Sequence, residues 1–155
     1  MLRHHFLPIV LSLSLQKILI VGGGRVALQK LKTLLKFNCA ITVVAAETHY
    51  LIKKLAAKKK ITLHERGFRK SDLRACTIVY ACTDDLKLNQ SIAELARKKS
   101  VLCNIASDPK LSNFISPAIY KSKNIIVAVS TAGQDPKASV KIRDDLKRML
   151  SNRGI

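Results

Sequence analysis

The strongest constraint on the fold lies in one short stretch, residues 18–30, which reads ILIVGGGRVALQK. Four apolar residues run into three glycines, and apolar residues then recur at positions 27, 28, 31, 34 and 35. A continuous apolar run is typical of a strand buried on both faces, and the later spacing is typical of a helix. Glycine destabilises the interior of either element. We therefore expect a strand, a turn whose geometry or ligand excludes side chains, and a helix.

Apolar strands and amphipathic helices alternate from this stretch through about residue 105. Alternation of this kind predicts βαβ units, and so an α/β fold with a Rossmann-type parallel sheet and helices on both faces. Asn38 is expected to close the first helix, because Asn tolerates a left-handed C-cap. The expected strands are 17–21, 40–46, 61–65, 76–82 and 100–105, and the expected helices are 26–37, 49–59 and 84–99.

The alternation of apolar strands and amphipathic helices ends after Asn104. Two apolar runs, 114–120 and 125–131, are separated only by the polar stretch KSKN, which predicts a β-hairpin. Pro136 suits the first turn of a final helix over 136–150. We therefore divide the chain into a Rossmann domain, 1–110, and a hairpin-plus-helix segment, 111–155.

The glycine turn has the spacing of a dinucleotide-binding fingerprint. Gly22, Gly24 and Ala27 fit G-x-G-x-x-A, which combines a tight turn, close backbone approach and close helix packing. The N–H groups at the start of the helix would then face the pyrophosphate. The alternative is a tight turn with a structural purpose only.

Two further strand ends carry polar residues at the edge where open α/β sheets bind ligands. Glu47 follows the second strand, and an acid there favours NAD by binding the ribose 2′-hydroxyl. Thr83, Asp84 and Asp85 follow the fourth strand. Their alternative interpretation is a helix N-cap with acidic residues in the first turn, which is compatible with ligand binding.

Composition narrows the class of partner. The 155 residues carry 28 Lys and Arg against 10 Asp and Glu, a formal net charge of +18, which attracts polyanions. A solvated lysine-rich surface is the alternative, and the absence of basic and aromatic interleaving argues against nucleic acid. Four cysteines without C-x-x-C spacing indicate free thiols in a cytoplasmic protein, with no disulfide or metal site. The apolar N-terminus lacks a cleavage site and is interrupted by Pro8, so neither export nor a membrane partner is expected.

The order of motifs resembles the precorrin-2 dehydrogenase and sirohydrochlorin ferrochelatase family of sirohaem synthesis. The resemblance runs from Leu7 to about Leu150 and is carried by LPIVLSL, ILIVGGGRVALQK, ITVVA, YACTDDLKLN, CNIASDP, FISPAI and VAVSTAG. It implies NAD-dependent oxidation of precorrin-2 to sirohydrochlorin, sometimes followed by iron insertion, in a homodimer joined after the nucleotide domain. On this resemblance, 1–110 is the NAD-binding Rossmann domain and 111–155 is the segment for dimerisation and substrate. The cofactor-binding residues that it implies are Gly22, Gly24, Arg25, Val26, Ala46, Glu47 and Thr83.

One departure from the family pattern bears on catalysis. The family places an Asp after Asn and two apolar residues, whereas Ser107 stands at this position and Asp108 follows it. A serine neither acts as a carboxylate base nor neutralises a divalent cation. We therefore expect dehydrogenation without chelation, with Ser107 and Asp108 as the catalytic candidates. Asp108 is either a displaced base or a residue that starts the turn before Pro109.

Two other functions stay open at this point. One is the bifunctional dehydrogenase and ferrochelatase of the same family. The other, from a different class, is an NAD(H)-binding module that senses redox state, which would explain the glycines but not the later motifs. A polycarboxylate tetrapyrrole would also suit the positive charge, because Lys and Arg can pair with its acidic arms.

Overall fold

The computed structural model describes residues 6–74 and 76–153. They form two compact units, one of Val10–Phe114 and the other built mainly from the chain that begins at Ile115. The division between the units falls after Phe114. The assignment of 1–110 and 111–155 to separate functional domains remains a prediction.

A five-stranded parallel sheet forms the larger unit, with strand order β3-β2-β1-β4-β5. The chain passes to the other side of β1 after β3. In open sheets of this type, ligands bind where the strand order reverses, here at the carboxyl ends of β1 and β4. The strands are β1 (Lys17–Val21), β2 (Ala40–Val44), β3 (Thr62–His64), β4 (Ile78–Ala81) and β5 (Leu102–Ile105).

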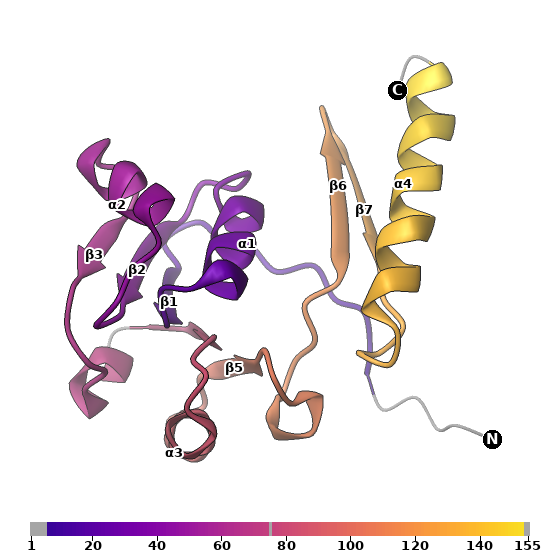
Figure 1. The fold of residues 1–155 in the computed structure, drawn as a ribbon. Helices are drawn as coiled ribbons and strands as arrows, with labels where there is room; N and C mark the ends of the chain where they lie inside the picture. The colour runs from indigo at the N-terminus through magenta and orange to yellow at the C-terminus, as the bar shows by residue number, and fades with distance from the viewer. Residues whose placement is uncertain (1–5, 75, 154–155) are drawn as a thin grey trace. The chain divides into compact units, whose positions relative to one another are not determined.

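Helices cover both faces of this sheet (Figure 1). One face carries α1 (Arg25–Leu34) and α2 (Tyr50–Ala57), and the other carries α3 (Leu86–Lys98) and the 3₁₀ helix η1 (Lys70–Arg74). Each face has its own apolar core, because successive strand residues point to opposite sides. Burying both faces explains why the strands read as continuous apolar runs. The predicted Rossmann-type architecture is confirmed.

The structure corrects the end of the first helix. We expected α1 to reach Phe37 and to close at Asn38, but it ends at Leu34 with Leu35 as its C-cap. The N–H groups of Lys36 and Phe37 donate to carbonyls three residues earlier, which tightens the last turn and ends the helix. The short helices η1 and η2 (Pro109–Leu111) were not predicted, because so few residues show no periodicity.

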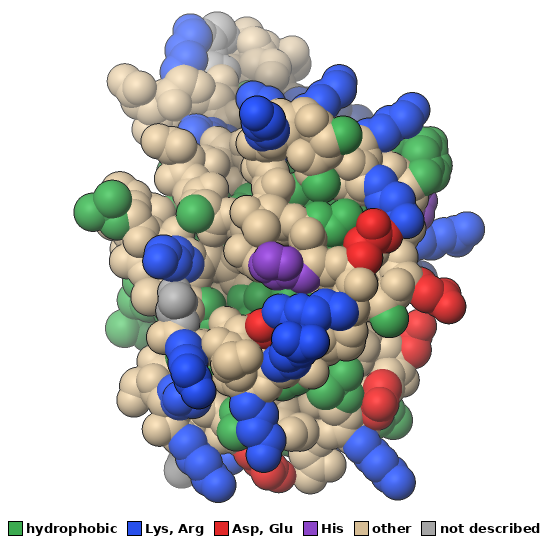
Figure 2. Space-filling model, turned by 90° about the vertical axis from the view of Figure 1, so that its left-hand side faces the viewer, with side chains coloured by type: hydrophobic (Ala, Val, Ile, Leu, Met, Phe, Trp, Pro, Cys, Tyr) green, Lys and Arg blue, Asp and Glu red, His purple; other side chains and the backbone are tan. Residues whose placement is uncertain are grey.

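The connection from β3 to β4 contains only η1, where a full helix would cover the sheet. A bidentate pair holds it: Arg66 donates to Asp72 at 2.9 and 2.7 Å, and this pair lowers the pKa of Asp72. A hollow of about 190 Å³ lies beside η1. Figure 2 views the molecule from the side of β3 and shows Lys and Arg side chains scattered over this surface. The hollow is lined by Lys17, Ile18, Leu19, Thr42, His64, Asp72 and Cys76.

The smaller unit is a hairpin with a helix packed on it. β6 (Ala118–Ser122) pairs antiparallel with β7 (Ile125–Val129), and α4 (Pro136–Asn152) contacts both strands. Pro136 stands in the first turn of α4, and the helix is capped by Asp135, which accepts from Ala138 N at 2.9 Å. The predicted hairpin and final helix are confirmed. Within residues 6–74 and 76–153, no helix is both long and apolar enough to cross a bilayer.

Candidate functional site

The first glycine of the turn is required by the fold itself. Gly22 has φ of +112°, and a Cβ atom built on it would lie 2.4 Å from the carbonyl oxygen of Cys82. Its own N–H donates to the carbonyl of Val44 at 2.9 Å. The end of β1 is therefore pressed against the ends of both β2 and β4, at a distance that leaves no room for a side chain.

The second glycine is required for a different contact. A Cβ on Gly23 would lie 2.2 Å from the carbonyl oxygen of Glu47 and 2.9 Å from the Cβ of Ala45. The carbonyl of Gly23 also accepts from His49 N at 2.8 Å. The loop after β2 thus lies directly on the glycine turn. The fingerprint treats this middle position as free, so sequence reasoning missed it.

The third glycine has no such explanation inside the protein. Gly24 has a φ of −82°, which any residue can adopt, and a Cβ built on it would meet nothing within 4 Å. The packing of the chain therefore does not demand glycine at this position. The open space lets another molecule come close to the backbone, as a pyrophosphate does in this motif.

The start of α1 has the features of an anion site. Of the four α-helices described, α2, α3 and α4 have their first N–H groups capped by His49, Asp85 and Asp135. Gly24 provides no side-chain cap to α1, and the first turn contains no acidic residue. Arg25 instead places a cation at the positive end of the helix dipole, which favours a bound anion.

The residues predicted at the end of β2 reach the same turn. Ala46 and Glu47 are both exposed, and the backbone of Glu47 lies against Gly23. The Glu47 side chain is therefore attached at the point where β2 meets the glycine turn. An acid at this place suits a ribose hydroxyl next to the pyrophosphate.

A polar cluster around the buried side chain of Asn89 joins the ends of β4 and β5. Asn89 of α3 is 1% exposed and accepts from Thr83 Oγ1 at 2.7 Å. Its Nδ2 donates to the carbonyl of Thr83 at 2.8 Å and to Ser107 Oγ at 3.4 Å. Sequence reasoning missed Asn89. The available signal was a polar residue within the apolar stripe of α3, whose buried members include Ile92 and Ala93.

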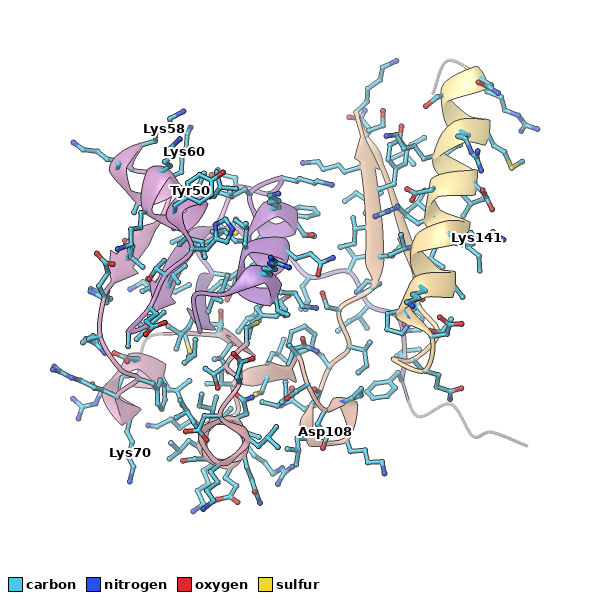
Figure 3. The ribbon with its side chains drawn as sticks, in the orientation of Figure 1. Tyr50, Lys58, Lys60, Lys70, Asp108 and Lys141 are labelled. Atoms are coloured by element: carbon cyan, nitrogen blue, oxygen red, sulfur yellow. The ribbon has the colours of Figure 1, made fainter. Side chains whose placement is uncertain are left out.

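Asp85 and Asp108 both have local structural tasks. Asp85 caps α3 by accepting from Leu88 N at 3.0 Å, the alternative interpretation given above. Asp108 starts η2 (Figure 3), and its Oδ1 accepts from Lys110 N at 2.9 Å. Oδ2 of Asp108 has no hydrogen-bond partner among the residues described. Turn formation therefore occupies one oxygen of this carboxylate and leaves the other available.

Contacts connect the sheet edge from β2 to β5. Glu47 touches Gly23, Gly22 touches Cys82 and Thr83, and Asn89 links Thr83 to Ser107. Most of the predicted site residues thus lie along one edge. Loops at the carboxyl ends of four neighbouring strands are held together by backbone contact and one buried amide.

Burial keeps the cysteine thiols in their protonated form. All four are free, and burial raises the pKa of Cys82 to about 12 and that of Cys76 and Cys103 to about 11. These three thiols are therefore protonated near neutral pH and are poor metal ligands. The described parts of the chain contain no group of three or more His, Cys, Asp or Glu side chains placed to hold a metal ion.

A parallel sheet whose first strand ends in an open glycine turn and an uncapped helix defines a dinucleotide-binding domain. In agreement, residues 9–118 match the model of the NAD(P)-binding family NAD_binding_7. The chain is 33% identical over 144 residues to the precorrin-2 dehydrogenase of Bacillus subtilis, covering 93% of this chain and 88% of that protein. The chain therefore belongs to the precorrin-2 dehydrogenase family, as its motifs indicated.

Other relatives are longer proteins, and the chain matches only part of their length. It is 35% identical over 145 residues to the siroheme synthase of Nitrosococcus oceani, covering 94% of this chain and 31% of that protein. The chain thus spans about a third of the length of the siroheme synthases that it matches. Among solved structures, SirC, a precorrin-2 dehydrogenase, matches with a TM-score of 0.76 and 28% identity over 92% of this chain and 70% of that one.

The surroundings of the glycines predict that one substitution lowers stability and another lowers cofactor affinity. Gly22→Ala should lower the free energy of unfolding by at least about 2 kcal/mol, because it strains the backbone against Cys82. Gly24→Ala should cost about 1 kcal/mol or less, mainly through a poorer N-cap. It should nevertheless raise the Kd for NAD⁺ about tenfold or more, because the added methyl occupies the ligand's space. Urea unfolding measures the stability of the two variants, and calorimetric titration measures their affinity for NAD⁺. Equal losses of stability would contradict the assignment of Gly22 to the fold and Gly24 to the ligand.

Proposed function

We propose that this chain oxidises precorrin-2 to sirohydrochlorin in sirohaem biosynthesis, with NAD as the hydride acceptor. The observation that carries the proposal is the connected sheet edge from Glu47 to Ser107, with the open turn at Gly24. Membership of the precorrin-2 dehydrogenase family supports the choice of substrate. All four cysteines are free thiols, which fits a reducing compartment such as the cytoplasm.

The described residues fit the cofactor. Gly22, Gly24, Arg25 and Val26 would hold the pyrophosphate at the uncapped start of α1. Ala46 and Glu47 would hold the adenosine ribose, with Glu47 accepting from its 2′-hydroxyl and disfavouring a 2′-phosphate by charge. Thr83, at the end of β4, would lie beside the nicotinamide half. When bound, oxidised nicotinamide supplies the acceptor for a hydride from the substrate.

The reaction also requires that the substrate lose a proton, and Ser107 and Asp108 are the two candidate residues for this step. Asp108 retains a free Oδ2, so a carboxylate that also starts η2 can accept that proton. Ser107 lies beside it without a basic side chain among its partners. We propose that Asp108 takes the proton, in the place of the carboxylate that Ser107 replaces. The net charge of +18 suits a polycarboxylate substrate.

We further propose that the chain forms a homodimer through the smaller unit. Ile125 and Ile126 of β7 and Val140, Ile142 and Met149 of α4 are exposed apolar residues, between 36% and 54% accessible. Several exposed apolar residues on one hairpin and one helix are typical of a part of the chain that another protein covers. A second copy is the occupant that we propose, since the family resemblance implies dimerisation through this part of the chain.

The activity prediction concerns cofactor choice. Precorrin-2 mixed with the protein and NAD⁺ should give sirohydrochlorin and NADH, with kcat/KM about tenfold or more above that with NADP⁺. Glu47→Gln should reduce this preference, because it removes the charge that repels a 2′-phosphate. Absorbance of the reduced cofactor and of sirohydrochlorin measures the rate with each cofactor, for the natural chain and for Glu47→Gln. Protein that binds NAD⁺ and leaves precorrin-2 unchanged would instead favour the redox-sensing module.

The chelation prediction concerns position 107. The natural chain should not accelerate insertion of Fe²⁺ or Co²⁺ into sirohydrochlorin, because Ser107 cannot neutralise the cation. Ser107→Asp should raise insertion above the uncatalysed rate, followed by the spectral change of the macrocycle. Ser91→Asp, an exposed change on α3, is the matched control. Iron insertion by the natural chain would support the bifunctional alternative.

A homodimer should be visible in the mass of the protein in solution. Light scattering should give about twice the 17.2 kDa of one chain. Ile142→Glu should shift the mass toward that of the monomer, because it puts a charge on the proposed apolar interface. Lys141→Gln, on the adjoining exposed position of the same helix, changes the net charge by the same amount and controls for charge alone. A monomeric natural chain at micromolar concentration would refute the dimer.

A further inference from the structure

We propose that the Ser107 hydroxyl donates a hydrogen bond to an oxygen of the bound ligand, and that Asn89 sets this direction. The inference rests on the proposed function, because it assigns a purpose to one residue of the same site. It makes position 107 a donor of hydrogen bonds in this chain, where an ionised carboxylate could only accept them.

The orientation of the Asn89 amide follows from its partners. The carbonyl of Thr83 can only accept, so the atom 2.8 Å from it must be the Nδ2 donor. Oδ1 is then the atom that receives the hydroxyl of Thr83 at 2.7 Å. The second N–H of Asn89 is left for Ser107 Oγ at 3.4 Å. Because Asn89 is 1% exposed, water does not readily replace these contacts.

This arrangement determines what the Ser107 hydroxyl can do. Its oxygen accepts from Asn89, and within the described parts of the chain its own proton has no acceptor. The side chain is exposed beyond β5, at the edge that also carries the glycine turn. The proton is therefore free for a ligand placed at this edge.

The same contacts argue against proton transfer by Ser107. A serine becomes a base or nucleophile when a histidine or carboxylate accepts its proton. The hydrogen-bond partner recorded for its hydroxyl is a neutral amide that donates. Ser107 is therefore a binding residue in this chain, and the proton of the reaction must go elsewhere.

Two ligand oxygens have the required chemistry. One is the carboxamide oxygen of the nicotinamide ring, and the other belongs to a carboxylate arm of the tetrapyrrole. Both accept a hydroxyl donor, and the two sources are separable because cofactor and tetrapyrrole can be titrated independently.

The test compares Ser107→Ala with Ser107→Thr, which keeps the hydroxyl. NAD⁺ and sirohydrochlorin are each titrated by calorimetry, so that neither measurement requires turnover. Ser107→Ala should weaken binding of one of the two about two- to tenfold, as expected for loss of one hydrogen bond. Ser107→Thr should stay within about twofold of the natural chain. The ligand that loses affinity identifies the acceptor.

Asn89→Asp tests the direction of the hydrogen bond. An acceptor at position 89 would draw the Ser107 proton inward, so this variant should reproduce the affinity loss of Ser107→Ala. Because Asn89 is buried, the urea unfolding curve of Asn89→Asp is measured as well. If Asn89→Asp does not fold, Ser107→Ala remains the decisive variant. Ser91→Ala, exposed on α3, should change neither affinity.

Several results would overturn the inference. Ser107→Ala with natural affinity for both ligands would do so, even if the natural chain oxidises precorrin-2. A shift in the pH profile of kcat on Ser107→Ala would instead make Ser107 a proton-transfer group. A natural chain that binds neither ligand would refute the inference together with the proposed function. Failure to oxidise precorrin-2 with the affinity loss still present would refute the proposed function alone.

Discussion

The structure depends on how closely the end of β1 approaches its two neighbours. At Gly22 the backbone meets Cys82 after β4, and at Gly23 it meets Glu47 after β2, at distances that a Cβ would violate. These contacts bring three strand ends together without side chains between them. Backbone N–H groups and the start of α1 are thereby left facing the sheet edge, where a phosphate can use them. Folding thus requires Gly22 and Gly23, whereas the open space at Gly24 is left for a ligand.

The other half of the edge is held by polar contacts. Asn89 joins the loops after β4 and β5, and the segment after η2 supports β5 from the outer side. Ile105 N donates to Ser112 Oγ at 2.8 Å, and Cys103 N donates to Asn113 Oδ1 at 2.7 Å. Side-chain hydrogen bonds thus pair the edge of β5 where no further strand is present. The loop that carries Ser107 and Asp108 is therefore fixed on both sides.

Much of this architecture was readable from local patterns. The apolar runs and the helical spacing predicted the five parallel strands, three helices, hairpin and final helix in the right order. The strand over 17–21 was predicted with its observed bounds, but most other elements differ by one to a few residues at their ends. Propensity does not show where a tertiary contact ends a strand or helix. Asn38 was wrongly assigned as the cap of α1, because the turn of hydrogen bonds after Leu34 ends the helix earlier. The short η1 and η2 gave no signal.

By itself, the sequence determined the fold class, the place of the glycine turn and the family, because each depends on residue types at short, regular spacing. Only the tertiary structure decided which glycine serves the fold and which leaves room for a ligand, since Cys82 and Glu47 lie far from the turn in the chain. It also decided the environment of Ser107. The amide that orients its hydroxyl is 18 positions away, and no local pattern shows that α3 brings this amide to the loop after β5.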